Sequence, residues 1–354
     1  MVDLPAATAP YEPVLLFTRG RIVESFHNGA IAVVNTEGHL VASYGDPHAV
    51  TYLRSSAKPF QTLPLVELGA VDKFGLTPRE LAITCASHLG LDMHVETVMG
   101  LQKKIGVGES DLLCGTHPLS DPALAARLIR EGQAPTPLRH NCSGKHTGML
   151  AQAKFRDVPI VDYINPLHPV QQAILQTFAE MCDVEPQEVV VGIDGCSVPT
   201  FAVPLMNAAL AFARLADPGR LPAPRAAALT TIFTAMTTNP EMVRGPGEFD
   251  TEIMRLCPGK LVSKSGAEAY VGIGLAPGAC GPNSPALGVA LKIGDGGTRA
   301  DMMVAVEVLR QLGVLDGRQV SKLIELGLGP TKVLKNFRSL EVGEARPCFE
   351  LKFE

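Results

Sequence analysis

Strand-like sequence occurs at both ends of the chain and helical sequence fills the middle, an order that leaves few folds open. Short β-branched or alternating apolar runs, which are typical of strands, occupy residues 14–17, 30–35, 39–44, 261–264, 269–275 and 286–293. No internal repeat, low-complexity tract or linker divides the chain. We therefore expect one α+β domain over residues 1–354, built from two intertwined subdomains. Its terminal strands should pair in one mostly antiparallel sheet beside a helical subdomain.

The central and closing segments carry helical periodicity. Apolar residues recur at helical spacing in residues 92–105, 123–131, 144–155, 169–182, 204–215, 226–238, 299–312 and 320–328. Residues 55–68 share this pattern, but Pro59 and Pro64 predict a kink or a break there. One apolar strand, residues 188–193, interrupts the helices and should end in a turn at Asp194-Gly195-Cys196.

Composition narrows the class of protein. Of the 354 residues, 46% are hydrophobic and 19% are charged, which supports a packed core rather than a disordered chain. The net charge of −5 and the absence of Trp disfavour a nucleic-acid partner. No apolar run reaches the roughly 20 residues that cross a bilayer, and the first 13 residues lack a signal-peptide pattern. We therefore expect a cytoplasmic protein with no membrane partner, whose eight cysteines are reduced.

The motif Ser55-Ser56-Ala57-Lys58 is the sharpest candidate for chemistry. At spacing i, i+3 on a helix, Ser55 and Lys58 share one face. A serine hydroxyl is a weak nucleophile until a base removes its proton, and a lysine whose ammonium is disfavoured by burial can act as that base. The same four-residue pattern also arises by chance in a chain of this length. The motif alone therefore does not decide between a catalytic pair and ordinary helix residues.

A second Lys/Ser motif, Lys264-Ser265-Gly266, ends a predicted strand. Serine β-lactamases and penicillin-binding proteins combine S-x-x-K at a helix start with K-[ST]-G on an edge strand. The two motifs occur here in that order. Ser87 lies between them, near the end of a predicted helix, where a third serine motif belongs. Together the three motifs favour a Ser/Lys site over a solvated strand lysine and an unrelated serine.

A polar segment, residues 141–148, precedes an apolar helix, so its amide groups are candidates for binding a ligand carboxylate. It contains Cys142 and Lys145, and Cys196 follows the strand at 188–193. Zinc signatures usually pair their ligands locally, and these two cysteines are far apart in sequence. From the residues alone, buried inert thiols remain the default and a metal site stays open.

Six motifs in this order resemble those of the rhizobial-type (class 3, asparaginase II) L-asparaginases, from about residue 14 to the C-terminus. They are Arg54-Ser55-Ser56-Ala57-Lys58-Pro59, Cys85-Ala86-Ser87-His88, Asn141-Cys142-Ser143-Gly144-Lys145-His146, Gly192-Ile193-Asp194-Gly195-Cys196, Lys264-Ser265-Gly266-Ala267-Glu268 and Leu291-Lys292-Ile293-Gly294-Asp295-Gly296. The chain departs from the family pattern at Ala269, where we expect glycine. It departs again after His88, where we expect a Gly-Glu pair. These departures bear on substrate preference and leave the site residues intact.

The resemblance implies a fold like that of serine β-lactamases and glutaminases, and a homodimer. It also implies a catalytic set of two Ser/Lys pairs: Ser55 with Lys58, and Ser87 with Lys264. A zinc ion is implied as cofactor, bound by Cys142, Lys145 and Cys196, and the lysine can bind it only after losing a proton. Substrate-binding positions match Arg54, His146 and Asp194.

The expected activity is hydrolysis of L-asparagine to L-aspartate and ammonia by Ser/Lys nucleophilic catalysis, with Ser55 slightly preferred as nucleophile. A glutaminase or a β-lactamase-like serine hydrolase remains an alternative, although a β-lactamase predicts secretion. The non-enzyme alternative is an amino-acid-sensing pseudoenzyme, which we expect to have lost a member of a Ser/Lys pair. Both pairs are present here.

Overall fold

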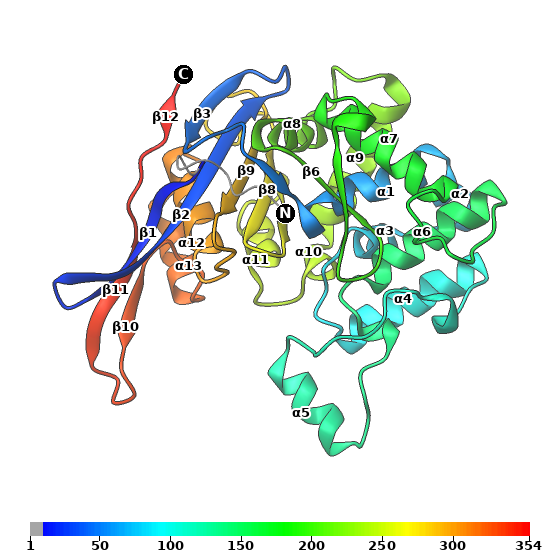
Figure 1. Cartoon of the computed structure of the whole chain (residues 1–354), viewed down its shortest axis with the longest axis horizontal. Coiled ribbons are helices and arrows are strands. Elements are labelled where there is room, and N and C mark those ends of the chain that lie inside the picture. The colour runs from blue at the N-terminus through cyan, green and yellow to red at the C-terminus, as the bar shows by residue number, and fades with distance from the viewer. Residues whose placement is uncertain (1–9) are drawn as a thin grey trace, which may run out of the picture.

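The computed structural model describes residues 10–354, and its largest element is a nine-stranded sheet whose paired strands are all antiparallel (Figure 1). The main path runs β10-β11-β1-β2-β9-β8-β7, with β3 beside β2 and β12 beside β3. The strands are β1 (Glu12–Arg19), β2 (Ile22–Asn35), β3 (Leu40–Tyr44), β7 (Leu261–Gly266), β8 (Tyr270–Leu275), β9 (Leu287–Ile293), β10 (Lys332–Lys335), β11 (Glu341–Pro347) and β12 (Lys352–Phe353). The expected α+β class, with terminal strands paired in an antiparallel sheet, is confirmed.

A helical part lies beside the sheet (Figure 1). Its helices are α1 (Lys58–Glu67), α2 (Ala70–Phe74), α3 (Pro78–Thr84), α4 (Asp92–Ile105), α5 (Pro122–Arg130), α6 (Ser143–Arg156), α7 (Pro169–Cys182), α9 (Ala223–Thr238), α10 (Pro240–Val243) and α11 (Phe249–Leu256). A small second sheet, ordered β4-β6-β5, comprises β4 (Val50–Tyr52), β5 (Val190–Ile193) and β6 (Pro199–Pro204). None of the helices described within residues 10–354 is long and apolar enough to span a membrane.

Helices cover the central strands. Successive side chains on a strand point to opposite faces of a sheet. Every residue of β8 and β9 is buried, so both faces of the sheet are covered at these two strands. Helix α8 (Leu205–Ala216) and helix α12 (Asp301–Gln311) both pack against these two strands. Glycines allow α8 to approach closely, because a Cβ at Gly288 would lie 1.8 Å from the carbonyl oxygen of Ala209. The last helix, α13 (Gly317–Glu325), precedes the C-terminal strands.

Side-chain caps and turn residues fix the ends of several helices and strands. Thr77 caps α3 through a reciprocal bond with Glu80, with Pro78 in the first turn. A hairpin turn joins β2 to β3, and Gly38 in this turn has a φ of 84°. There the amides of Glu37 and His39 donate to the side-chain oxygen of Asn35. The turn at Asp194-Gly195-Cys196 follows β5 as predicted.

Other expectations were wrong in whole or in part. The break expected at the prolines of residues 55–68 occurs next to Pro59, which lies in the first turn of α1, and does not occur at Pro64. The 3-10 helix η1 (Arg54–Ala57) leads into α1, which continues through Pro64 because residues 58–65 are held by burial on all sides. The chain does not close with helices, since β10, β11 and β12 follow α13. These strands are mostly exposed and rich in charge, so they lack the apolar alternation by which β1 and β2 were predicted.

Candidate active site

Ser55 lies in η1, immediately before α1, and Lys58 is the first residue of α1. The residue before the serine, Arg54, has a φ of 52°, a left-handed backbone conformation that non-glycine residues rarely adopt. An ion pair with Asp194, 2.7 Å long, holds the Arg54 side chain in place. Such local strain persists only where the surrounding contacts fix it, and it is common at functional sites.

Lys58 contacts Ser87 rather than Ser55. The Lys58 side chain is fully buried, and its Nζ lies 2.9 Å from Ser87 Oγ. The same nitrogen donates to the carbonyl oxygen of Ala86. Burial lowers the pKa of Lys58, which favours the neutral amine that can accept a proton. The expected pairing of Ser55 with Lys58 and of Ser87 with Lys264 is therefore not the arrangement in the structure.

Ser87 lies in the loop after α3, and backbone bonds from two other segments hold this loop. The Ser87 amide donates to the carbonyl of Val243, and the His88 amide donates to that of Asn141. The loop is thus fixed between the end of α10 and the segment that begins α6. This explains how a serine just beyond a helix reaches Lys58 on a different helix.

The edge strand β7 brings Lys264 to the same place. The Ser56 hydroxyl donates to the carbonyl oxygen of Lys264 at 2.6 Å, which ties η1 to β7. Close approach requires glycine at position 266, because a Cβ there would lie 2.4 Å from the carbonyl oxygen of Leu53. The S-x-x-K and K-S-G motifs are therefore joined by direct contact, as the sequence pattern predicts.

Lys264 is fully buried, and Asp250 of α11 is its acidic neighbour. Lys264 Nζ donates to the Ser265 carbonyl at 2.6 Å and lies 3.8 Å from Asp250 Oδ2. Burial lowers the pKa of Lys264 to about 7; Asp250 opposes this shift, and the positive charges of Lys58 and Arg244 add to it. Asp250 also accepts hydrogen bonds from the hydroxyls of Ser263 and Ser265. A buried lysine of this kind can exchange a proton near neutral pH.

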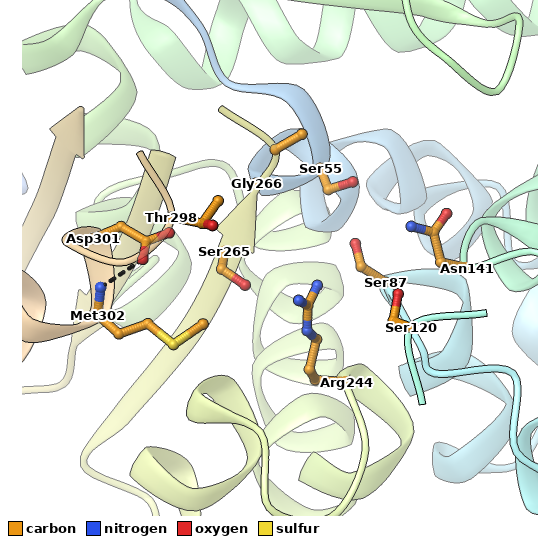
Figure 2. Close-up of a pocket in the computed structure, with 11 residues that line it drawn as sticks. Ser55, Ser87, Ser120, Asn141, Arg244, Ser265, Gly266, Thr298, Asp301 and Met302 are labelled. Carbon is orange, nitrogen blue, oxygen red and sulfur yellow. Dashed lines mark hydrogen bonds between the residues drawn. The ribbon is translucent and has the colours of Figure 1, made fainter. Parts of the chain in front are cut away.

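A cavity of about 360 Å³ opens beside these groups (Figure 2). This volume lies within the range of small-molecule sites, roughly 300–1,000 Å³. The hydroxyls of Ser55 and Ser87 both point into it. We call it the larger cavity; its lining is Ser55, Ser87, Ser120, Asn141, Arg244, Ser265, Gly266, Ala267, Thr298, Asp301 and Met302.

A smaller cavity of about 190 Å³ adjoins it, since Ser55, Asn141 and Ala267 line both. Its remaining lining residues are Arg54, His117, His140, Cys142, Asp194, Gly195 and Cys196. Two of the predicted substrate-binding residues, Arg54 and Asp194, therefore border this smaller cavity. Ser55 stands at the junction, and its side chain is only partly buried.

The third predicted substrate-binding residue, His146, lies elsewhere. Its ring is completely buried within α6, and its Nδ1 lies 2.7 Å from the hydroxyl oxygen of Tyr163. His146 lines neither the larger nor the smaller cavity. Burial holds the pKa of His146 well below its usual value, and the Lys145 charge adds to this shift. A neutral, packed histidine fits this position, and direct substrate contact does not.

The predicted zinc ligands are brought together from two segments. Lys145 Nζ lies 2.9 Å from Cys196 Sγ, and Cys196 and Cys142 share a hydrogen bond. That bond holds the pKa of Cys142 well below its usual value, while the same bond and burial raise the pKa of Cys196. Burial would lower the pKa of Lys145, but the two sulfurs outweigh it and raise that pKa.

Zinc in proteins accepts cysteine sulfur and nitrogen ligands, so these three donors fit the metal. The Lys145 ammonium would lose its proton on binding. Within residues 10–354, no group of three or more His, Cys, Asp and Glu side chains is arranged to hold a metal ion. A site here would therefore depend on the lysine as its third protein ligand.

Three charged residues of this region could not be predicted from sequence motifs: Arg244, Asp250 and Asp301. Asp250 and Arg244 carry no motif, because they come from a short helix and the loop before it. Asp301 follows the polar, glycine-bearing segment between β9 and α12, which is the one signal that could have indicated it. The packing of α11 against β7 places Asp250 near Lys264, and Arg244 and Asp301 line the larger cavity.

Solved structures with low similarity include a probable glutaminase from Bacillus subtilis complexed with 6-diazo-5-oxo-L-norleucine. That comparison has 12% identity, covers 81% of this chain and 84% of the other, and has a TM-score of 0.40. A β-lactamase from Mycobacterium bovis gives 16% identity, coverage of 80% and 95%, and a TM-score of 0.40. A sequence comparison with curated proteins found no significant match.

The family comparison covers nearly the whole described chain. The family model described as L-asparaginase II matches residues 15–347. The matched range contains both cavities, Lys58, Lys264 and all three predicted zinc ligands. The chain therefore belongs to the L-asparaginase II family.

Proposed function

We propose that this chain hydrolyses the side-chain amide of L-asparagine, which yields L-aspartate and ammonia. Membership of the L-asparaginase II family supports an amidohydrolase. The observation that carries the proposal is the 2.9 Å contact between Lys58 Nζ and Ser87 Oγ at the wall of the larger cavity. A buried amine within hydrogen-bond reach of a serine is the arrangement that activates hydroxyl nucleophiles. The motif set also supports assignment to the rhizobial type within this family.

Ser55 is the proposed nucleophile. Its side chain is partly exposed and borders both cavities, whereas Ser87 is almost completely buried and its hydroxyl is engaged by Lys58. Ser55 Oγ attacks the amide carbon, and its proton passes through the Ser87 hydroxyl to neutral Lys58. The C–N bond then breaks, and the leaving nitrogen takes a proton back along the same path. Free ammonia and an ester on Ser55 result.

Water completes the reaction. The amine of Lys58, neutral again, accepts a proton from a water molecule that attacks the ester carbon. The ester C–O bond breaks, Ser55 recovers its proton and L-aspartate leaves. Lys264, held by Asp250 and Ser265, supplies a second buried amine, and its neutral form relays protons in the same array.

The proposal includes a zinc ion held by Cys142, Lys145 and Cys196. Bound there, the ion would supply positive charge beside the substrate and fix the shape of the smaller cavity. The donor set supports this assignment, because two sulfurs and an amine nitrogen already converge.

An ammonia-release assay on the purified chain tests the function. We expect turnover of L-asparagine to be much faster than turnover of L-glutamine, with no hydrolysis of a chromogenic β-lactam. Equal or faster release from L-glutamine would favour a glutaminase. Binding of L-asparagine without any release would favour an amino-acid sensor, and it would overturn the proposal.

A further inference from the structure

Two charged side chains of opposite sign line the larger cavity, Arg244 and Asp301, and its other lining residues are neutral (Figure 2). A free α-amino acid carries one carboxylate and one ammonium group. We propose that Arg244 binds the α-carboxylate of the substrate and Asp301 binds its α-ammonium. The larger cavity then recognises a free zwitterionic amino acid rather than an amide within a peptide. This inference rests on the proposed function, which it deepens by assigning the groups that hold the substrate.

The terminal nitrogens of Arg244 have no hydrogen-bond partner among the side chains of residues 10–354. Its Nε donates to Glu248 at 3.1 Å, which orients the side chain, and the guanidinium reaches into the larger cavity (Figure 2). A guanidinium has five N–H donors in a planar fork that suits a carboxylate, so the terminal nitrogens remain for a ligand. The carbonyl of Arg244 accepts from the Leu89 amide, two residues beyond Ser87. The anchor and the Lys58–Ser87 pair are therefore connected through one short loop.

Asp301 lacks a cationic partner. It is the first residue of α12, only 2% exposed, and it accepts a hydrogen bond from the Met302 amide at 2.8 Å. Among the side chains of residues 10–354, no Lys, Arg or His nitrogen lies within ion-pair distance of its carboxylate. Burial raises the pKa of Asp301 to about 7, and the nearby Asp250 adds to this shift. A substrate ammonium would supply the missing counter-charge.

The competing pair, Arg54 and Asp194, is less suited to this task. These two side chains already bind each other at 2.7 Å, so each satisfies the charge of the other. A zwitterion would have to break that ion pair, whereas Arg244 and Asp301 make no ion pair with each other within the described residues. Arg244 pairs with Glu248 through Nε but keeps its terminal nitrogens, and Asp301 has no cationic partner among residues 10–354, so the larger cavity is favoured.

Calorimetric binding with three ligands separates the two charge contacts. The ligands are L-asparagine, succinamic acid, which lacks the amine, and 3-aminopropanamide, which lacks the carboxylate. All titrations use a Ser55→Ala background, so that no ligand is turned over. Arg244→Gln should weaken L-asparagine and succinamic acid about 10- to 100-fold and leave 3-aminopropanamide nearly unchanged. Asp301→Asn should weaken L-asparagine and 3-aminopropanamide by a similar factor and spare succinamic acid.

Two matched controls are available. Arg255→Gln lies on α11, the helix that follows the loop carrying Arg244, and Glu307→Gln lies on α12 with Asp301. Neither residue lines the larger cavity, so both variants should bind all three ligands normally. A uniform loss for all ligands, or a fall in thermal midpoint without selectivity, would mean that Arg244 and Asp301 only support the fold. That result, or the absence of any effect, overturns the inference. The selective pattern in a chain whose wild type releases no ammonia would instead support the inference and refute the proposed hydrolysis.

Discussion

Lys58 Nζ lies 2.9 Å from Ser87 Oγ, although 29 positions separate the two residues and they belong to different elements. Both side chains are buried, and the hydroxyl also borders the larger cavity. The contact joins the proposed base, Lys58 at the start of α1, to the proposed proton relay, Ser87 in the loop after α3. A base and a hydroxyl held this way need no rearrangement before the proton moves.

Replacement of Lys58 by Met should lower the kcat for L-asparagine by on the order of 10³-fold or more, as nucleophile or base deletions do in other serine hydrolases. Methionine keeps the apolar volume but cannot accept a proton. Since Lys58 and Ser87 act on one proton, Lys58→Met combined with Ser87→Ala should cost little more than Lys58→Met alone. Initial rates for both single variants and the double variant check this.

Folding must be separated from chemistry in that experiment. The exposed Lys260→Met serves as the matched control, with expected wild-type turnover, and thermal midpoints are measured for every variant. Multiplicative losses from Lys58→Met and Ser87→Ala would mean that the two residues act independently. Normal turnover in a folded Lys58→Met protein would exclude the lysine as base.

The rate should rise with pH near neutrality. The pKa of Lys264 is lowered to about 7, mainly by burial, so the neutral amine predominates only above that value. We expect kcat/KM for L-asparagine to increase as pH rises through about 7 and to lose this dependence in Lys264→Met. A pH–rate profile of both proteins measures the effect. An unchanged profile in the variant would assign the titration to another group.

The lowered pKa of Lys264 also makes the stability of the fold depend on pH. The unfolded chain has a lysine pKa of about 10.4, so it binds more protons than the folded chain between about 7 and 10. The contribution of Lys264 to the free energy of unfolding therefore falls as pH drops through this window and is constant below it. Lys264→Met should flatten the pH dependence of the thermal midpoint there, which scanning calorimetry measures.

Zinc content tests the Cys142, Lys145 and Cys196 assignment. Elemental analysis of protein purified without chelator should find about one zinc per chain. Cys142→Ser and Cys196→Ser should each lose most of it, because serine is a poor zinc ligand. Cys182→Ala, a buried thiol at the end of α7, provides the control and should retain the metal. Unchanged zinc in both serine variants would place the metal elsewhere.

Much of the fold follows from local sequence. The strands β1, β2, β8 and β9 have apolar patterns dense enough to identify them, and the capping box at Thr77 marks the start of α3. The closing strands could not be identified, because β10 and β11 carry many exposed, charged residues. Strand β11 pairs with β1 through contacts more than 300 positions apart in the chain, which no local window contains, and β10 then pairs with β11.

The candidate site was partly predictable. The motifs predict that particular serines, lysines and cysteines carry chemistry. The structure places Ser55, Ser87, Cys142 and Cys196 at two adjoining cavities, with lysines in contact with Ser87 and Cys196. Which amine meets which hydroxyl depends on how the loop after α3 is held by Val243 and Asn141, so spacing alone gave the wrong pairing. The orientation of His146 could not be predicted from its motif either, because α6 directs the ring toward Tyr163 and not into either cavity.

Covalent trapping tests the central claim, acylation of Ser55 beside the Lys58–Ser87 pair. The diazo ketone that matches L-asparagine in length, 5-diazo-4-oxo-L-norvaline, should alkylate the attacking hydroxyl. Trypsin separates the candidates, because Ser55 falls in the peptide 55–73 and Ser87 in the peptide 80–103. Mass spectrometry should place one adduct on Ser55, with no adduct in Ser55→Ala and slower labelling in Ser87→Ala. An adduct on Ser87 or on a cysteine, or undiminished labelling of Ser55→Ala, would contradict the account.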